Sequence, residues 1–449
     1  MSLARVLVAV LVLVASRASV ARSTSEKSNR QQNPAAECHK CLYVRAPNAF
    51  ARVVNGTEET IELIGFNHYF AAEIASETRE GLFEMDWSDG VGRATTRDTM
   101  ETAAANGMNA VRAWAFSVRE NAGDAHDEEV VRGLRTLASE AARVDVYLIL
   151  ALSDYWHRAP SALRACAGDD ADDDDDRAFY ENASCRDAYK RHARRVVEAL
   201  REYSSVAAWN LINEPRCRGC GDALQAWIDE MAAYVKSIDP RRLVTVGEEG
   251  FYARDGPSPN ADANPAPWAY TTGQDFVRNH ASPNVDFAAA HIWRDNWAVY
   301  SPTVAFDGAR FTRDWIRAHE EDARRLLGKP VVVEEFGAAE RGVFSLRRAS
   351  RDDDDDDDGE SNRRRPPLWF LRRPNERARV SEYYRYVFSH ARRSIATDAH
   401  LRGTLFWNFF PDVMRGRVET HDPYAVFVSD DAFAEAARFA SSVGASRNV

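Results

Sequence analysis

Several features that would point to other classes of protein are missing from this 449-residue sequence. Histidine and aspartate form no compact cluster with the spacing of metal ligands, so a metal-dependent hydrolase is disfavoured and neither a metal nor another cofactor is expected. Basic residues are not in excess, because the formal net charge is −11, which argues against a nucleic-acid partner. After residue 15 no apolar run is long enough to cross a bilayer, so no membrane partner is expected for the mature chain.

The first 21 residues have the layout of a secretory signal peptide. Arg5 precedes an apolar run over 6–15, and Ser19-Val20-Ala21 supplies a small-residue cleavage site. A retained signal anchor is the alternative interpretation. Residues 22–37 are rich in serine, asparagine and glutamine and are expected to be disordered. The predicted protein is therefore secreted and extracellular, with one folded domain over 38–449.

All six cysteines lie beyond the proposed cleavage point, and an even number in a secreted chain suggests three disulfides. Proximity in the sequence suggests the pairs Cys38–Cys41, Cys166–Cys185 and Cys217–Cys220. The two Cys-x-x-Cys pairs leave a zinc site as an alternative, although their separation is far from that of a zinc ribbon.

Apolar strands alternate with amphipathic helices from residue 64 to residue 409. Strands are expected at 64–69, 110–116, 146–154, 206–214, 243–248, 286–293, 330–336 and 403–409. Helical periodicity occupies stretches between them, such as 130–143, 188–203, 224–238, 312–327 and 380–393. A hairpin that turns at Asn55-Gly56 precedes the first strand. This pattern predicts an α/β fold, a single (β/α)8 TIM barrel with an N-terminal β-hairpin.

Two aspartate runs interrupt the alternation, at 169–176 and at 352–358. Because neighbouring aspartates repel one another, both runs are expected to be solvated loop insertions. Calcium binding is the alternative, but neither run has glycine-spaced ligands. The runs follow the third and seventh expected strands, so they belong to the rim where the strands end.

Two of the expected strands end in carboxylates. One leads into Asn213-Glu214-Pro215 and the other into Glu334-Glu335-Phe336-Gly337. Loss of solvent at a strand end raises the pKa of a carboxyl, as a general acid near neutral pH requires. For either site alone, an ion-paired structural glutamate is the alternative. Two such sites, 335 − 214 = 121 positions apart on one barrel rim, indicate the acid pair of a glycosidase.

These two strands resemble the acid/base and nucleophile strands of glycoside hydrolase family 5, and more narrowly those of its plant and fungal endo-β-1,4-mannanases. The segment 221–240 and the motif Gly247-Glu248-Glu249-Gly250-Phe251-Tyr252 add to the resemblance, which covers roughly residues 42 to 430. By matching position, the resemblance implies that Glu214 is the acid/base and that Glu335 is the nucleophile. Glu334 is the rival nucleophile, but side chains alternate along a strand, so it is expected to point out of the barrel interior.

The resemblance also implies roles for neighbouring side chains. Asn213 matches the asparagine that contacts the sugar 2-hydroxyl. Arg112 matches the arginine beneath the nucleophile, where a cation keeps the carboxylate ionised, and a structural ion pair is the alternative. His291 matches the histidine that orients the acid/base, with a satisfied core histidine as the alternative. Two positions later the family commonly has a tyrosine against the nucleophile, and Trp293 departs from this pattern because an indole cannot act as a phenol.

Exposed tryptophans at strand ends suit a polysaccharide cleft, because pyranose rings stack on aromatic planes. Trp407 matches the tryptophan that forms the floor under the cleaved sugar. Further subsite contacts are expected from Trp114, Trp156 and Trp297, with Arg216 and Tyr69 as weaker candidates. Core packing is expected of Trp209, Trp227 and Trp315.

The resemblance thus implies a retaining endo-glycosidase, monomeric, that hydrolyses internal β-1,4 linkages in mannan, glucomannan and galactomannan by double displacement. Mannose differs from glucose by an axial 2-hydroxyl, so a β-1,4-glucanase or mixed-specificity family 5 hydrolase is the nearest alternative. An inactive carbohydrate-binding barrel is the alternative from another class. The presence of Glu214, Glu335, Arg112 and Trp407 argues against it, because a binding module has no use for a proton donor paired with a nucleophile.

Overall fold

A computed structural model describes residues 40–446, apart from 46–47, 79–84, 120–123, 167–175, 300, 302–303, 305–306, 340–375, 398 and 419–421. The expected signal peptide, the 22–37 segment, Cys38, most of the first aspartate run and the whole of the second lie outside the described residues.

The centre of the molecule is a parallel sheet of eight strands in the order β8-β7-β6-β5-β4-β11-β10-β9. The strands are β4 (Leu63–Asn67), β5 (Ala110–Trp114), β6 (Tyr147–Ala151), β7 (Val206–Asn213), β8 (Leu243–Gly247), β9 (Ala288–Ile292), β10 (Val331–Phe336) and β11 (Leu401–Phe406). Every residue in these strands is buried, as expected for a parallel sheet covered by helices. The ends of the sheet meet where the N–H of Asp286, just before β9, donates to the carbonyl oxygen of Val244 in β8 at 2.8 Å, and where the N–H of His291 in β9 donates to that of Glu249, just after β8, at 3.1 Å. The predicted (β/α)8 barrel is therefore confirmed.

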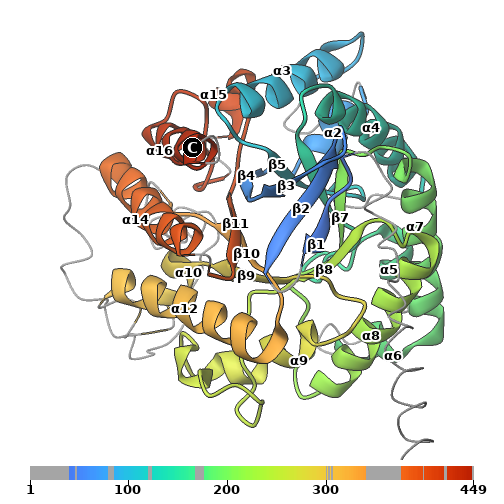
Figure 1. The fold of residues 1–449 in the computed structure, drawn as a ribbon. Coiled ribbons are helices and arrows are strands. Elements are labelled where there is room, and N and C mark those ends of the chain that lie inside the picture. Colours follow the sequence, from blue (N-terminus) through green and yellow to red (C-terminus); the bar gives the residue numbers. More distant parts are fainter. Residues whose placement is uncertain are drawn as a thin grey trace, which may run out of the picture.

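Helices surround the strands as an outer ring (Figure 1). The longer ones are α3 (Val91–Ala105), α4 (Asp124–Arg143), α7 (Ala183–Leu200), α8 (Gly221–Ile238), α12 (Gly308–Asp322), α14 (Glu376–Ala396) and α16 (Asp431–Ser446). Short helices are α2 (Ala71–Ala75), α5 (Ser161–Cys166), α6 (Asp176–Glu181), α9 (Phe276–His280), α10 (Arg294–Ala298) and α15 (Arg415–Val418). Single tighter or wider turns are η2 (Ala261–Ala263), η3 (Pro267–Thr271), η4 (Ala323–Leu327) and η6 (Asp412–Met414).

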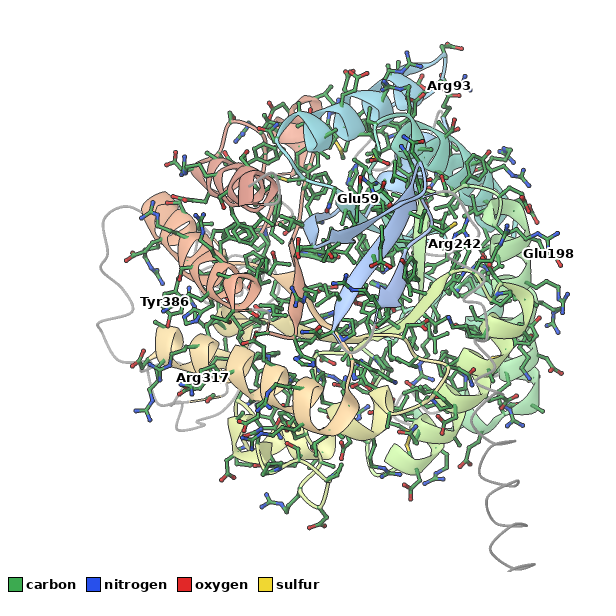
Figure 2. All side chains as sticks on the ribbon, in the orientation of Figure 1. Glu59, Arg93, Glu198, Arg242, Arg317 and Tyr386 are labelled. Carbon is green, nitrogen blue, oxygen red and sulfur yellow. A yellow bond between two sulfur atoms is a disulfide. The ribbon has the colours of Figure 1, made fainter. Side chains whose placement is uncertain are left out.

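Charged side chains cover the outside of this ring. Glu198 on α7 and Arg317 on α12 lie at the periphery in Figure 2, and both are exposed. By contrast, Arg242 is 1% exposed and donates to the backbone carbonyl oxygens of Arg201 and Tyr203. On the helices, charged side chains such as those of Glu198 and Arg317 thus face outward, as the amphipathic pattern of the sequence predicts.

A small antiparallel sheet closes the N-terminal end of the barrel. It consists of β1 (Tyr43–Arg45), β2 (Ala49–Val54) and β3 (Thr57–Ile61) in that order. Asn55 and Gly56 turn the β2–β3 hairpin with φ values of 51° and 78°, as a two-residue type I′ turn requires. The hairpin was predicted, whereas β1 was not. Phe50 and Ile61 from this sheet, with Leu42 just before it, form one apolar cluster with barrel residues that include the first residues of β4, β5 and β8. This packing occupies the N-terminal end and leaves the C-terminal rim for chemistry.

Two of the three predicted disulfides are confirmed, Cys166–Cys185 and Cys217–Cys220. The third stays a prediction, since Cys38 is not described. The expectation that the first aspartate run is fully solvated is wrong at its last residue. Asp176 is 3% exposed, because its carboxylate accepts hydrogen bonds from Tyr155 Oη at 2.9 Å and the Arg218 backbone N–H at 3.0 Å. In the described part of the chain, no helix has the length and apolarity that a membrane span needs.

Candidate active site

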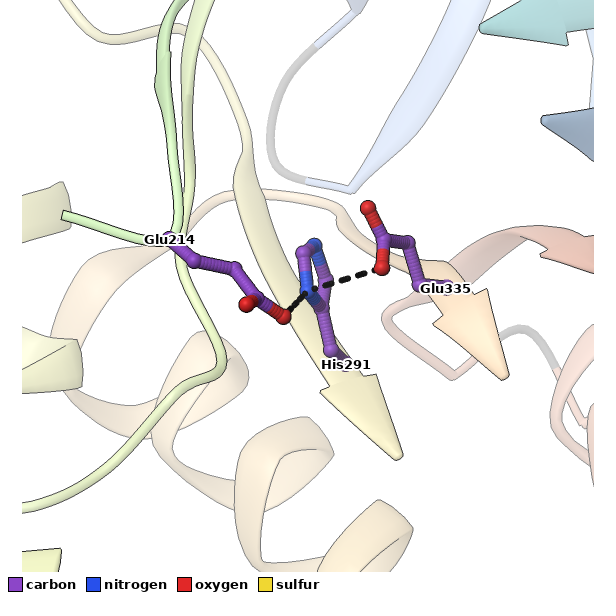
Figure 3. Close-up of side chains that lie close together, drawn as sticks. All are labelled: Glu214, His291 and Glu335. Atoms are coloured by element: carbon purple, nitrogen blue, oxygen red, sulfur yellow. Dashed lines mark hydrogen bonds and ion pairs between the residues drawn. The ribbon is translucent and has the colours of Figure 1, made fainter. Parts of the chain in front are cut away.

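Four strand ends deliver the central side chains to the C-terminal rim. Arg112 lies on β5, Glu214 directly after β7, His291 on β9 and Glu335 on β10. Because all eight strands are parallel, their carboxyl ends meet at one rim, and residues up to 223 positions apart in sequence come into contact there. Figure 3 shows Glu214 and Glu335 approaching one another from opposite sides of His291.

Glu214 is 8% exposed and is held at both carboxyl oxygens. Nδ1 of His291 lies 2.7 Å from Oε1, and the indole N–H of Trp156 donates to Oε2 at 2.6 Å. The backbone of Glu214 has a φ of 45°, a left-handed conformation that is strained for a glutamate and is typical of functional sites. Burial raises the pKa of Glu214, and the charge of Asp154 raises it further, while Arg216, the Trp156 hydrogen bond and Arg112 lower it.

Glu335 forms a buried ion pair with Arg112. Nη1 of Arg112 lies 2.5 Å from Oε1 of Glu335, and the two side chains are 0% and 3% exposed. Burial raises the pKa of Glu335, whereas Arg112 lowers it and repulsion from Glu214 raises it again. A negative charge on either of these two carboxyls opposes ionisation of the other, so each raises the pKa of its neighbour. The positive charge of Arg112 favours the ionised form of Glu335 against the effect of burial.

Glu334 does not point out of the barrel, so this expectation is wrong. Its carboxylate accepts a hydrogen bond from Asn210 Nδ2 at 2.8 Å and lies 3.4 Å from Nε of Arg112, and its side chain is 0% exposed. The reason is a register shift in the β10–β9 pairing. Val333 pairs with Ala290 and Glu335 with His291, which leaves Glu334 as the extra residue of a bulge. A bulge breaks the alternation of side chains, so both glutamates face inward.

Asn213 is held at both ends of its side-chain amide. Its Oδ1 accepts a hydrogen bond from Nη2 of Arg112 at 2.8 Å, and its Nδ2 donates to Oδ1 of Asp154 at 2.9 Å. Arg112 therefore contacts Glu334, Glu335 and Asn213 with one guanidinium. Its contacts extend beyond the single structural ion pair that was the alternative interpretation. With one N–H of the amide used by Asp154, one N–H remains for a ligand.

His291 contacts both candidate catalytic carboxyls, because its Nδ1 lies 3.4 Å from Oε2 of Glu335 as well. Burial and the charge of Arg112 lower the pKa of His291 well below its usual value, which keeps the imidazole neutral. The ligating atoms of Glu214, His291 and Glu335 lie within 4.8 Å of one another, a grouping that could hold a metal ion. Arg112 already bonds to Glu335, and its positive charge would oppose a second cation at this point.

Trp407 follows β11 and is partly exposed, with aromatic rings packed around it. Ring centroids lie 5.5 Å away for Trp114 and 5.8 Å away for both Tyr69 and Trp293. Trp293 itself is 9% exposed and packs its ring against Trp407 and, at 5.1 Å, Tyr424. The structure thus brings Trp407 and Trp293 to the site, with Trp293 as a neighbour of Trp407.

Two of the tryptophans expected in subsites are instead buried. Trp114 is 1% exposed and packs behind Trp407, with the guanidinium of Arg112 4.6 Å from its ring. Trp297 is 4% exposed and packs against Phe251, Phe311 and Trp315. Neither offers a free ring face, because each ring is packed against other aromatic rings. Core positions for Trp209, Trp227 and Trp315 are confirmed, since these are 0%, 2% and 1% exposed.

Trp156 differs from the other tryptophans because it is 52% exposed while its indole N–H reaches Glu214. Arg216 stacks on it, with the guanidinium 4.7 Å from the ring. Arg216 forms an ion pair with buried Glu249, which in turn accepts a hydrogen bond from Gln274. A chain of contacts therefore runs from Glu249 through Arg216 and Trp156 to the carboxyl of Glu214.

Sequence reasoning did not single out Asp154 or Glu249 as site residues. Asp154 is 2% exposed at the end of the third expected strand, and Glu249 is 1% exposed just after the fifth. Burial raises the pKa of Glu249 to about 7, even though Arg216 lowers it. The strand-end rule that identified Glu214 applies to both residues, and it would have found them if applied to every strand.

Comparison with known proteins places this arrangement in a family. The model of the family described as GH family 5 beta-mannosidase-like matches residues 63–433. Mannan endo-1,4-beta-mannosidase 8 of Oryza sativa subsp. japonica is 35% identical over 295 residues, which cover 61% of this chain and 75% of the relative. Mannan endo-1,4-beta-mannosidase 1 of Arabidopsis thaliana is 32% identical over 319 residues, which cover 67% and 73%.

Solved structures share the fold at lower identity. A glycoside hydrolase family 5 mannosidase from Rhizomucor miehei superimposes with a TM-score of 0.65 at 19% identity, covering 91% of this chain and 99% of that one. An endo-beta-1,4-mannanase from Thermotoga petrophila gives 0.59 at 21% identity, covering 85% and 76%. The match over residues 63–433 spans the whole barrel and both strand-end carboxyls. The chain belongs to glycoside hydrolase family 5, in its beta-mannosidase-like group.

Proposed function

We propose that this protein is a retaining endo-β-1,4-mannanase with Glu214 as acid/base and Glu335 as nucleophile. One observation carries the proposal: carboxyl oxygens of the two glutamates lie within 4.8 Å of one another, and only Glu335 is ion-paired with Arg112. Retaining glycosidases hold their carboxyls ~5–5.5 Å apart, whereas inverting enzymes leave ~6.5–9.5 Å for a water molecule. The separation and the unequal environments both support double displacement.

In the first step, Glu214 protonates the oxygen of the scissile linkage while an oxygen of Glu335 attacks the anomeric carbon. The leaving chain departs with the proton of Glu214, and the remaining chain is bound covalently to Glu335 as an ester. In the second step, Glu214 takes a proton from water, which attacks the anomeric carbon and releases Glu335. Neutral His291 at 2.7 Å orients the carboxyl of Glu214 in both steps.

Two residues supply the contacts that change between ground state and transition state. Asn213 donates its free amide N–H toward the sugar 2-hydroxyl, an interaction that strengthens as the ring approaches the oxocarbenium ion. Trp407 provides the apolar floor for the sugar bound to Glu335. Trp156, with its exposed ring beside Glu214, offers a stacking face on the leaving-group side.

The mannan preference rests on the relatives, which carry the name mannan endo-1,4-beta-mannosidase at 32% and 35% identity. Expected substrates are mannan, glucomannan and galactomannan, and the reaction uses no cofactor. We also propose that the protein is secreted and acts as a monomer. Secretion is supported by the signal-like 1–21 segment and by two disulfides, which persist in oxidising compartments.

The test measures reducing-sugar release from purified protein on pure mannan, glucomannan and carboxymethyl-cellulose. Wild type should cleave both mannans and not cellulose, and Glu214→Gln and Glu335→Gln should each lose ~10³-fold or more in kcat. Glu140→Gln is the matched control, because Glu140 is 8% exposed on α4 and pairs with Arg97 and Arg143 away from the site. Proton NMR of the first products should show retained anomeric configuration.

Other outcomes assign other functions. Cleavage of cellulose by wild type would favour a β-1,4-glucanase or a mixed-specificity enzyme. Binding without cleavage of any of the three polysaccharides would identify a carbohydrate-binding barrel and overturn the catalytic roles. Inverted products would contradict the nucleophilic role of Glu335 while leaving both glutamates in the mechanism.

A further inference from the structure

Asp154 is a buried carboxylate that the mechanism above does not use. It lies after the end of β6, is 2% exposed, and both of its oxygens accept hydrogen bonds. Oδ1 accepts from Nδ2 of Asn213 at 2.9 Å, and Oδ2 accepts from the backbone N–H of His157 at 3.0 Å and lies 2.8 Å from Nδ1 of the His157 ring. The carboxyl of Asp154 is therefore fixed in orientation by contacts at both of its oxygens.

The backbone on both sides of Asp154 is fixed against the neighbouring strand. The N–H of Asn213 donates to the carbonyl oxygen of Ser153 at 2.9 Å, and the N–H of Tyr155 donates to that of Asn213 at 3.1 Å. Asp154 also pairs with Ala159 across the short 155–158 loop. The carboxylate is therefore held in place by main-chain contacts that do not depend on a bound ligand.

Asp154 and Arg112 together determine which way the amide of Asn213 faces. Arg112 can only donate and the Asp154 carboxylate can only accept, so Oδ1 of Asn213 must face Arg112 and Nδ2 must face Asp154. If the amide were rotated by half a turn, a donor would meet a donor and an acceptor would meet an acceptor. The group left for a sugar hydroxyl is consequently a donor.

The geometry points to Asp154 as a positioning residue that fixes the amide of Asn213 and places its buried carboxyl beside the backbone segment that carries Glu214. This inference rests on the proposed function, since it assigns a purpose to a group that acts through Asn213 and Glu214. Asp154 raises the pKa of Glu214 through its charge, in addition to the larger effect of burial. The same carboxylate would thus serve both substrate orientation and proton retention.

Several other charged or titratable groups face Glu214 or Asp154. The groups that interact electrostatically with Glu214 are Arg216, Arg112, the neutral His291, the carboxyl of Glu335 and Glu249. Around Asp154 lie the His157 ring and Tyr69, whose pKa is raised by burial and by the charge of Asp154. The His157 side chain is 55% exposed, and its ring Nδ1 lies 2.8 Å from Oδ2 of Asp154.

The decisive variant is Asp154→Asn, with Asp127→Asn as the matched control. Asp127 is also 2% exposed and also accepts from backbone N–H groups, those of Ser117 at 3.0 Å and Ser161 at 3.3 Å, but does not touch the site. An asparagine at 154 must present its NH2 group either to Nδ2 of Asn213 or to the two His157 groups that now contact Asp154. We expect kcat/KM on glucomannan to fall ~10-fold or more and the alkaline limb of its pH profile to move to lower pH by roughly half a unit or more. Asp127→Asn should leave the limb in place.

A double-variant comparison separates positioning from a general loss of structure. If Asp154 acts on the substrate through Asn213, Asp154→Asn combined with Asn213→Ala should lose no more kcat/KM near the optimum than Asn213→Ala alone. Multiplied losses together with an unmoved alkaline limb would overturn the proposal. Asp154→Ser, which removes the charge from a smaller side chain, gives the same test if Asp154→Asn does not fold.

A readout without substrate keeps this test distinct from that of the proposed function. The Trp156 indole donates to Glu214, so Trp156 fluorescence, taken as the difference from a Trp156→Phe protein, should report ionisation of Glu214. Asp154→Asn should move that titration to lower pH. An unshifted titration refutes the electrostatic role of Asp154, whether or not wild type cleaves mannan in the same preparation.

Discussion

Nη1 of Arg112 lies 2.5 Å from Oε1 of Glu335, inside the barrel and out of contact with solvent. The same guanidinium reaches Asn213 at 2.8 Å through Nη2 and Glu334 at 3.4 Å through Nε. Its planar fork is therefore shared between the proposed nucleophile, the amide proposed to contact the sugar and a second carboxyl, that of Glu334. A point charge on a flexible stem could not serve all three directions at once.

Replacing Arg112 by lysine should therefore lower kcat ~10²-fold or more, because the multidentate geometry is lost even though the charge remains. The pKa of Glu335 should rise as its ion pair weakens, so the acidic limb of the kcat/KM profile should move to higher pH. Arg242→Lys is the control, since buried Arg242 binds backbone carbonyls away from the carboxyls. An unmoved acidic limb in Arg112→Lys would contradict the role assigned to Arg112.

Trp156→Phe should shift the pH profile in the direction opposite to Asp154→Asn. The indole hydrogen bond lowers the pKa of Glu214, so its loss should raise that pKa and extend activity to higher pH. A phenyl ring retains a stacking face, so KM should change less than the position of the alkaline limb. Trp297→Phe, in the buried aromatic cluster, should lower the melting temperature and leave the limb where it is.

Glu334→Gln should change how stability depends on pH. Burial raises the pKa of Glu334 from 4.5 to about 7 despite Arg112, so the folded state holds a proton that the unfolded state releases between these values. Stability should consequently decline as pH rises from 4.5 to 7, by about 3 kcal/mol at most from this group. A glutamine cannot ionise, so the variant should gain in melting temperature relative to wild type between pH 5 and pH 8. A difference that does not vary with pH would refute this assignment.

The two described disulfides should differ in what they contribute to stability. Cys166–Cys185 spans a sequence separation of 19 and Cys217–Cys220 one of 3. In the chain-entropy model the longer loop is worth about 3 kcal/mol and the shorter about 2 kcal/mol. Paired serine substitutions, measured by guanidinium unfolding, should rank in that order. The reverse order would mean that native contacts around 217–220 outweigh loop closure.

The sequence was sufficient to predict the barrel because each strand is a short apolar run at a regular distance from the next. It was also sufficient to identify Glu214 and Glu335 as candidate catalytic residues, because burying acids at two strand ends is costly. It did not predict the orientation of Glu334, since the bulge at 333–335 depends on pairing with β9 and leaves no local mark. The burial of Trp114 and Trp297 depends likewise on rings contributed by distant segments, which single positions do not reveal.

The sheet formed by β1, β2 and β3 has a consequence for what can reach the covalent intermediate of the proposed mechanism. Phe50 and its neighbours fill the N-terminal end of the barrel, so in the described part of the chain the core is apolar and tightly packed at that end. Water and a second sugar chain must then arrive through the same mouth that the leaving chain vacates. Water and the second sugar chain therefore compete for one opening. The ratio of hydrolysis to transfer onto another sugar is then set by how long the leaving chain occupies that opening.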